Sequence, residues 1–212
     1  MNTAQKKILI IDDEAIFREA MVDALTPCGY LCTTEDNPGD GIKRLKTARF
    51  DLVLLDIMMN PLDGWDTLDH IRNIPLGQSI PVIMASAKTL QADEIIRYGE
   101  QVAGFLKKPF QPADFCEDVS KFFSWYDKVI SDANQAEANG VPRSVCDQWI
   151  RLSRQIQAIR RLKEIVSPRC IPEGYMTEEE CQAKKIREID RIIDEKILER
   201  ADIEVQYPSL VG

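Results

Sequence analysis

Short apolar runs alternate with amphipathic segments along the first half of the chain. Between the runs, apolar residues such as Phe17, Met21 and Ala24 recur at helical spacing, which is typical of helices that cover a sheet. Two of the runs are apolar nearly throughout, as expected for strands buried on both faces. The pattern predicts an α/β domain with a doubly wound, five-stranded parallel sheet. Its strands are expected at about 6–12, 30–35, 50–56, 80–86 and 102–107.

The second half of the chain changes from this alternating pattern to long helical stripes. A helix that starts before Phe115 is predicted to continue to about Glu137, where Asn139-Gly140 ends it. A second helix is predicted from about Pro142 to near Val166, followed by the turn-rich stretch PRCIPEGYM. Thr177 and Glu180 form a capping box that predicts the start of a third helix. We therefore expect an all-α extension.

Two segments are predicted to be weakly held. The helix from Leu90 to Tyr98 has only a loose apolar stripe, and the tail from about Val205 is expected to fray.

The boundary between the α/β domain, 1–123, and the helical module, 124–212, is placed where the pattern changes.

The charges of the last two predicted helices are complementary. Residues 142–169 carry seven basic and two acidic residues, net +5, whereas 173–204 carry six basic and eleven acidic residues, net −5. An antiparallel hairpin packed on the extended helix explains both the charges and the apolar stripes.

Composition limits the class of protein. The hydrophobic content of 44% and the net charge of −8 are ordinary for a globular chain, and no run approaches the roughly 20 apolar residues of a membrane span. We therefore expect a cytoplasmic protein with no membrane segment. The six cysteines form no CxxC pair and are expected to be free thiols rather than a metal site or disulfides.

Residues that can handle phosphate or a metal ion follow four of the predicted strands. Asp12 and Asp13 follow the first, Asp56 ends the third, Ser86 ends the fourth, and Lys108 follows the fifth. Because the carboxyl ends of parallel strands meet at one edge of a sheet, these groups should share a crevice. Carboxylates are the ligands that Mg²⁺ prefers, and an ammonium group can bind a phosphoryl oxygen. Taken singly, Asp12 and Asp13 could instead be helix-capping acids that follow a strand.

These motifs resemble the receiver domain of two-component response regulators. The segments IIDDE, LLDIMMNPLDG, VIMASA and FLKKPF stand in that family's order and spacing over roughly residues 5–123. The resemblance implies a flavodoxin-like sheet with strand order 2-1-3-4-5. One departure is that Asn60 stands where relatives usually have proline, with Pro61 one residue later. We expect a reshaped loop there and an intact site.

The resemblance also implies a role for each site residue. Asp56 would be the phosphoacceptor, and Asp12, Asp13 and Asp56 would bind Mg²⁺ together with the backbone carbonyl of Met58. Lys108, expected before a cis peptide bond to Pro109, would contact the phosphoryl group. Ser86 would be the switch hydroxyl and Phe105 the aromatic residue that moves with it.

The leading hypothesis is a response regulator that accepts a phosphoryl group on Asp56 from a sensor histidine kinase or phosphotransfer protein. His70, the only histidine, is interpreted as a surface residue, so the donor histidine belongs to another protein. The helical module would then control association with a downstream protein target or homodimerisation. The chain would not be an enzyme beyond phosphotransfer to itself and its own dephosphorylation.

Two other functions compete with this hypothesis. In the first, the helical half is a phosphorylation-controlled DNA-binding output that uses Arg154, Arg160 and Arg161. No winged-helix or helix-turn-helix pattern accompanies these arginines. In the second, the chain is a Mg²⁺-dependent phosphatase with Asp56 as nucleophile, but Ile57 and Met58 stand where such an enzyme normally places a second acid.

Overall fold

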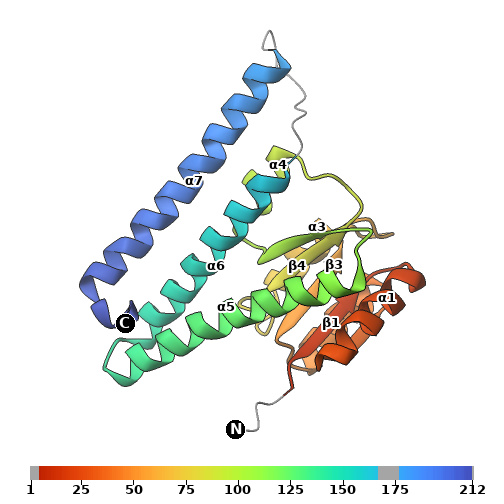
Figure 1. Cartoon of the computed structure of the whole chain (residues 1–212), viewed down its shortest axis with the longest axis horizontal. Helices are drawn as coiled ribbons and strands as arrows, with labels where there is room; N and C mark the ends of the chain where they lie inside the picture. Colours follow the sequence, from red (N-terminus) through yellow and green to blue (C-terminus); the bar gives the residue numbers. More distant parts are fainter. Residues whose placement is uncertain (1–4, 167–176, 212) are drawn as a thin grey trace. The chain divides into compact units, whose positions relative to one another are not determined.

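The computed structural model describes residues 5–166 and 177–211 (Figure 1). Its first part alternates strands and helices, and its last part is helical. The strands are β1 (Lys7–Ile11), β2 (Leu31–Glu35), β3 (Leu52–Asp56), β4 (Val82–Ser86) and β5 (Gly104–Lys107). The α-helices are α1 (Ala15–Leu25), α2 (Pro38–Thr47), α3 (Gly64–Arg72), α4 (Ala92–Tyr98), α5 (Pro112–Ala138), α6 (Arg143–Ile165) and α7 (Glu178–Gln206). Two short 3-10 helices, η1 (Thr26–Cys28) and η2 (Pro208–Leu210), complete the described elements.

The five strands form one parallel sheet in the order β2-β1-β3-β4-β5, which confirms the predicted topology. Every residue of β3 and β4 is buried, as their continuous apolar sequences predict. The register pairs Ile11 with Leu55, Asp56 with Ala85, and Ser86 with Lys107. The carboxyl ends of β1, β3, β4 and β5 therefore lie along one edge of the sheet.

Side-chain caps define where two of the helices begin. The Asn37 side chain accepts a hydrogen bond from the backbone N–H of Asp40 (2.9 Å), and Asp63 accepts one from Asp66 N–H (2.9 Å). Each cap satisfies a backbone donor that has no partner inside its helix. The second cap begins α3 directly beside the end of β3, which places the loop after Asp56.

The packing divides the chain into two compact units, which are described separately. The first unit runs up to Lys88 and includes Gly104–Ser120; it contains the sheet, α1, α2, α3 and the start of α5. The second unit comprises Thr89–Ala103 and the chain from Lys121 onward. The segment that contains α4 thus leaves the sheet unit and groups with the C-terminal helices.

In the second unit, α6 and α7 form the predicted antiparallel hairpin (Figure 1). Trp149 near the start of α6 donates its indole N–H to Glu204 near the end of α7 (2.9 Å), and Lys163 near the end of α6 forms an ion pair with Asp190. The extended α5 ends at Ala138, within one residue of the prediction. Its apolar side chains Val129 and Ala133 pack in the same buried cluster as Trp149.

The prediction that the C-terminal tail frays is wrong. Helix α7 continues to Gln206, and the 3-10 helix η2 follows it. Leu210 is only 1% exposed because it packs into the cluster formed by α5 and α6. This burial fixes Leu210 against α5 and α6. The predicted turn-rich stretch PRCIPEGYM lies outside the described residues.

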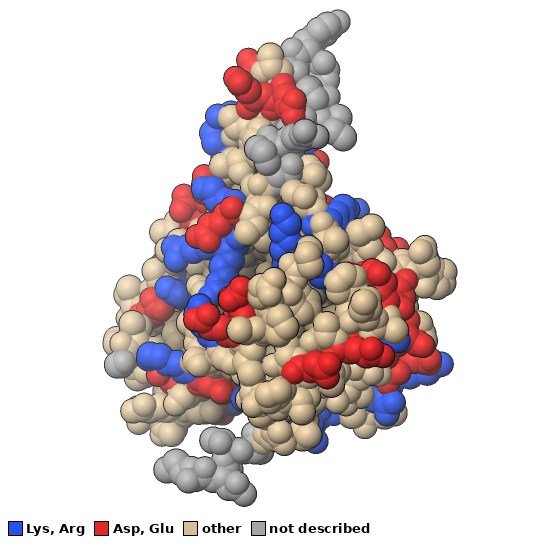
Figure 2. Space-filling view, turned by 45° about the vertical axis from the view of Figure 1, so that its right-hand side comes forward, with Lys and Arg blue, Asp and Glu red and all other residues tan. Residues whose placement is uncertain are grey.

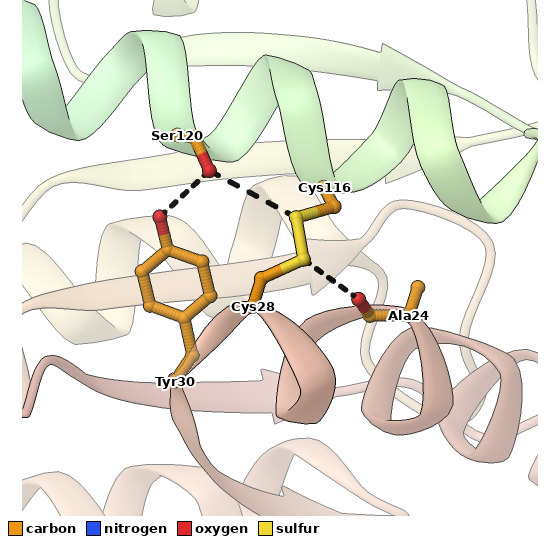
Figure 3. Close-up of a disulfide and its surroundings, with 5 residues drawn as sticks. All are labelled: Ala24, Cys28, Tyr30, Cys116 and Ser120. Carbon is orange, nitrogen blue, oxygen red and sulfur yellow. Dashed lines mark hydrogen bonds between the residues drawn. A yellow bond between two sulfur atoms is a disulfide. The ribbon is translucent and has the colours of Figure 1, made fainter.

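The expectation of free thiols is also wrong for Cys28 and Cys116, which form a disulfide (Figure 3). It joins η1 to the first turns of α5 within the sheet unit and spans a sequence separation of 88 residues. Beside it, the Tyr30 hydroxyl and the Ser120 hydroxyl form a hydrogen bond of 3.0 Å. Cysteine spacing along the sequence does not reveal this pair, since only the fold brings the two residues together. Cys32 and Cys146 are free thiols.

None of the helices in the described part of the chain is long and apolar enough to cross a bilayer.

Candidate functional site

Three aspartates gather at the carboxyl edge of the sheet. Asp12 and Asp13 follow β1, and Asp56 is the last residue of β3. One carboxylate oxygen from each lies within 4.8 Å of the others. Asp12 and Asp56 are buried, whereas Asp13 is exposed. The cluster is therefore open to solvent on the side of Asp13.

Lys108 lies between the two buried carboxylates. Its Nζ is 2.5 Å from Asp12 Oδ2 and 2.8 Å from Asp56 Oδ1, and the residue is only 3% exposed. The backbone N–H of Lys108 donates to the carbonyl of Ser86 (2.9 Å), which anchors the end of β5 to the end of β4. The peptide bond from Lys108 to Pro109 is cis, as the family resemblance implies. The ammonium group is thus held against the carboxylates.

The second oxygen of Asp56 is fixed by the loop that follows it. Asp56 Oδ2 accepts a hydrogen bond of 2.7 Å from the backbone N–H of Met58. The loop closes through Gly64 N–H, which donates to the carbonyl of Ile57 (2.9 Å). A Cβ on Gly64 would lie 2.2 Å from the Asp56 carbonyl oxygen, so only glycine fits there without displacing the backbone of Asp56.

The loop after Asp56 contains the departure noted in the sequence. The Asn60–Pro61 peptide bond is cis, which the sequence analysis did not predict. Asp63 and Gly64 still begin α3 in close contact with the end of β3. The start of α3 therefore contacts the backbone of Asp56 with the Asn60–Pro61 cis bond in the intervening loop.

Asp12 is surrounded by donors on several sides. Its Oδ1 accepts from the backbone N–H of Glu14 (2.9 Å), and Arg18 donates to its backbone carbonyl (2.6 Å). Burial raises the pKa of the Asp12 carboxyl, and the hydrogen bond and positive charge of Lys108 oppose that shift. The buried carboxylates of Asp12 and Asp56 repel each other, and added positive charge would reduce this repulsion.

The two predicted switch residues occupy neighbouring strands. Ser86 is fully buried at the end of β4, and its hydroxyl oxygen accepts from the backbone N–H of Lys88 (3.2 Å). Phe105 is half-buried on β5, where it pairs with Met84. Ser86 lies one residue beyond Ala85, the partner of Asp56 in the sheet. The structure thus brings Asp12, Asp13, Asp56, Lys108 and Ser86 to one sheet edge and places Phe105 next to that edge.

The charges at this edge fit a divalent cation. Three carboxylates and one ammonium group leave a formal charge of −2, and hard carboxylate oxygens are the donors that Mg²⁺ prefers. Met58 is 61% exposed, and its backbone N–H faces Asp56. The donor set is therefore suited to Mg²⁺, with Asp13 on its accessible side.

Phe17 is a site residue that the sequence analysis missed. The Lys108 ammonium lies over the face of the Phe17 ring, 4.4 Å from its centroid. In the sequence, Phe17 counts as part of the apolar stripe of its helix, and a cation–π contact across 91 positions leaves no local signal. Its place in the first turn of α1, after the two acids, is the one feature that points to the site.

Comparison with known proteins identifies the first half of the chain. The family model of the response regulator receiver domain matches residues 8–120. The chemotaxis protein CheY of Thermotoga maritima is 32% identical over 117 residues, which cover 55% of this chain and 96% of that protein. The probable transcriptional regulator ycf27 of Cyanidium caldarium is 33% identical over 113 residues, covering 53% of this chain and 44% of the relative. The transcriptional regulatory protein ResD of Bacillus subtilis is 31% identical over 112 residues, covering 53% of this chain and 45% of that protein.

This chain thus spans about half the length of the matched transcriptional regulators and nearly all of the chemotaxis protein. Among solved structures, a response regulator receiver protein from Pseudomonas putida has 26% identity and a TM-score of 0.51, with 56% of this chain and 98% of that one covered. The receiver domain of a sensor histidine kinase from Pseudomonas aeruginosa, solved with magnesium in its active site cleft, shares the fold at 24% identity, a TM-score of 0.51 and coverage of 57% and 99%. Through residues 8–120, the chain belongs to the response regulator receiver family.

Proposed function

We propose that this protein is a response regulator of a two-component phosphorelay that is phosphorylated on Asp56 and signals through its C-terminal helices. The observation that carries the proposal is the arrangement of Asp56 between an ammonium group and two other carboxylates at one sheet edge. We propose Asp12, Asp13, Asp56 and the backbone carbonyl of Met58 as the Mg²⁺ ligands. The domain boundary near residue 123 is part of the same proposal.

The chemistry expected of this site is phosphoryl transfer to a carboxylate. One Asp56 oxygen attacks the phosphorus of the donor, an O–P bond forms, and the bond from phosphorus to the donor breaks, with its electron pair remaining on the donor. Such a transfer needs positioning and compensation of negative charge more than covalent help. Lys108, already 2.8 Å from Asp56 Oδ1, neutralises charge on the transferred group, and Met58 N–H orients the carboxylate. Bound Mg²⁺ would offset the remaining negative charge.

The donor is proposed to be a histidine of another protein, either a sensor histidine kinase or a phosphotransfer protein. The single histidine of this chain, His70, is exposed near the end of α3, whereas the other end of that helix contacts Asp56. Hydrolysis of the acyl phosphate by water would return Asp56 to its carboxylate and end the signal. In this account the chain acts only on itself and is not an enzyme for other substrates.

The output is proposed to be protein association, either with a downstream target or with a second copy of the chain. Helices α6 and α7 bury their apolar stripes against each other and against α5, and their opposite charges pair. On the face drawn in Figure 2, basic and acidic side chains lie close together and do not form one broad basic surface. This distribution favours a protein partner over nucleic acid.

A DNA-binding output is the second candidate, because Arg160 and Arg161 are exposed on α6 and several relatives are transcriptional regulators. Against it, the described residues after Lys107 contain no strand from which a winged helix could be built. Arg154 is buried at 6% exposure and would not reach DNA. If this candidate is right, an Arg160→Ala/Arg161→Ala variant should bind duplex DNA less tightly and with a shallower salt dependence than the original chain. If the original chain shows no salt-dependent binding to duplex DNA, the DNA-binding candidate is ruled out.

The proposed phosphorylation is tested by incubating the protein with acetyl phosphate and Mg²⁺. The original chain should incorporate one phosphoryl group that hydroxylamine removes, as expected for an acyl phosphate, whereas Asp56→Asn should incorporate none. Asp23→Asn is the matched control, since Asp23 is an exposed carboxylate on α1 in the same unit. Equal labelling of the Asp56→Asn variant would refute the assignment.

A further inference from the structure

The strongest unassigned feature is the outer face of α7, the side of this helix that its own chain leaves open. On the inner side, Ile189 and Ile193 are buried where α7 packs against α6 and α4. On the outer side, Leu198 and Val205 are 65% and 82% exposed. Figure 1 shows α7 along the edge of the C-terminal helices, so its outer face is accessible to another molecule.

The inner face of α7 is occupied by the chain itself, because it holds α4. Lys185 lies 2.6 Å from Asp93 in the first turn of α4, and Lys196 lies 3.1 Å from Glu100, just beyond the end of that helix. Ile95, on the apolar side of α4, is only 3% exposed. The prediction that α4 is weakly held is therefore wrong, because the C-terminal helices, absent from the local sequence pattern, supply its packing. A partner for α7 must bind its outer face.

The exposed charges of α7 change sign near the middle of the helix. After the first turn, every exposed charged residue up to position 191 is basic, and every one from position 194 onward is acidic. The basic residues are Lys184, Arg187 and Arg191, and the acidic residues are Asp194, Glu195, Glu199 and Asp202. A helix face that meets only water is typically laced with alternating signs, which pair at i,i+4. The separation of the two signs therefore indicates a surface that binds another charged surface.

Four of these charges form one row along the helix. At about 3.6 residues per turn, they lie within about 40° of one another around the helix axis: Lys184, Arg191, Glu195 and Asp202. Leu198 and Val205 lie next to this row on the same side of the helix. Within the row, Arg191 and Glu195 form an ion pair of 3.4 Å in which both side chains are more than half exposed. Such an exposed pair is weak and leaves both groups able to bind an outside charge.

The row is complementary to itself when two copies of α7 run antiparallel. Lys184 and Arg191 are seven positions apart, and so are Glu195 and Asp202. In a two-fold pairing centred at the level of residue 193, the first and last members of the row lie opposite each other, and so do the two middle ones. Every pair then joins opposite charges, whereas a parallel pairing would place like charges together. The glutamates 178–180 would lie opposite the uncharged positions 206–208.

We propose that the outer face of α7 is a docking surface for the same face of a second copy of this chain, in antiparallel orientation. The four charges of the row set the register, and Leu198 is covered by the aliphatic parts of the arginines in the basic half of the other copy. This inference deepens the proposed output of protein association and rests on that proposal for its role in signalling. The pairing itself does not require phosphorylation of Asp56.

The first test measures the mass of the full chain by sedimentation equilibrium over a range of protein concentrations. At about 50 mM NaCl the mass should approach twice that of the monomer, and at about 500 mM NaCl the dissociation constant should be higher by about ten-fold or more, because salt screens exposed charges. A chain that stays monomeric at low salt would overturn the proposal. A dimer whose dissociation constant does not depend on salt would overturn it as well.

Charge reversal tests the register. Lys184→Glu/Arg191→Glu makes the row wholly acidic, and Glu195→Lys/Asp202→Lys makes it wholly basic, so each variant alone should dimerise more weakly by about ten-fold or more. An equimolar mixture of the two variants again places opposite charges together at every position of the row and should form dimers as tight as those of the original chain. Dimerisation of either variant alone at the original strength, or a mixture of folded variants no tighter than its components, would contradict the register.

Arg160→Glu/Arg161→Glu is the matched control, because it reverses two exposed basic residues on α6, and it should dimerise like the original chain. Equal weakening by this control would show a general effect of charge and overturn the proposal. If circular dichroism shows that a variant of the row has lost helix, the salt dependence of the original chain decides.

All of these measurements are made without a phosphodonor, so the two proposals can fail independently. A chain that dimerises but is not labelled by acetyl phosphate would refute only the proposed phosphorylation. A monomeric chain that is labelled on Asp56 would refute only the docking between copies of α7.

Discussion

Lys108 supplies the positive charge that offsets the buried carboxylates of the acidic cluster in the folded chain. Its ammonium group contacts Asp12 and Asp56 directly and is almost fully buried. Replacing Lys108 would leave two buried carboxylates without their shared cation, which is costly. The same group stands where a phosphoryl oxygen on Asp56 would need a donor. Stability and proposed function therefore depend on one side chain.

Phe17 should influence phosphorylation by holding that ammonium group in place. Phe17→Leu keeps an apolar side chain but removes the aromatic face 4.4 Å from Lys108 Nζ. The cation–π interaction is worth on the order of 1 kcal/mol, so we expect labelling by acetyl phosphate to slow by about three-fold to ten-fold. Phe17→Tyr retains the ring and should restore the rate. Equal rates for the leucine and phenylalanine forms would show that the ring does not position Lys108.

Asp12 should make stability fall as pH rises. Burial raises its pKa in the folded chain, so between the ordinary value and the raised one the folded chain binds more protons than the unfolded chain. Its contribution to stability is therefore lost as pH rises through that window. Asp12→Asn cannot ionise, and it should be the more stable form at pH 7, by on the order of 1 kcal/mol, with a smaller advantage at pH 4. Thermal unfolding in the presence of EDTA measures the difference, and an advantage that does not grow with pH would contradict the account.

At the scale of elements, the disulfide between η1 and α5 should stabilise the sheet unit. It closes a separation of 88 residues and so restricts the unfolded chain strongly. Cys28→Ser/Cys116→Ser should lower the free energy of unfolding by about 2–4 kcal/mol in urea titrations. Cys32→Ser, which removes a free thiol from the same unit, is the control. A loss no larger than that of the control would mean that the bond contributes little.

The elements of the sheet follow from local sequence, whereas several contacts do not. Apolar runs such as those of β3 and β4 specify buried parallel strands, and the residues at their ends converge for that reason. The Cys28–Cys116 bond and the burial of Leu210 depend on residues that are distant in sequence, so periodicity carries no sign of them. The ion pair between Lys185 of α7 and Asp93 of α4 is of the same kind, because the two residues are 92 positions apart. The peptide bond between Asn60 and Pro61 is cis. The sequence motif around Asp56 fixed only the length of the loop that contains this bond, so it gave no sign of the cis conformation.

At the scale of the whole molecule, phosphorylation is expected to alter the C-terminal helices through which the protein is proposed to signal. With beryllofluoride and Mg²⁺ as a phosphoryl mimic, amide hydrogen exchange should change in α6 and α7. Exchange in the buried strands β1 and β3 should not change, which provides an internal control. Identical exchange in α6 and α7 with and without the mimic would contradict the proposed output through these helices.

The central claim is that Asp56 carries the phosphoryl group, and chemical mapping of that position tests it most directly. Borohydride reduces an acyl phosphate of aspartate to homoserine, which peptide mass spectrometry locates. After incubation with acetyl phosphate and Mg²⁺, the account predicts homoserine at position 56 and unmodified aspartate at positions 12 and 13. Homoserine at either of those two positions, or none at position 56 in a chain that retains its label, would contradict it.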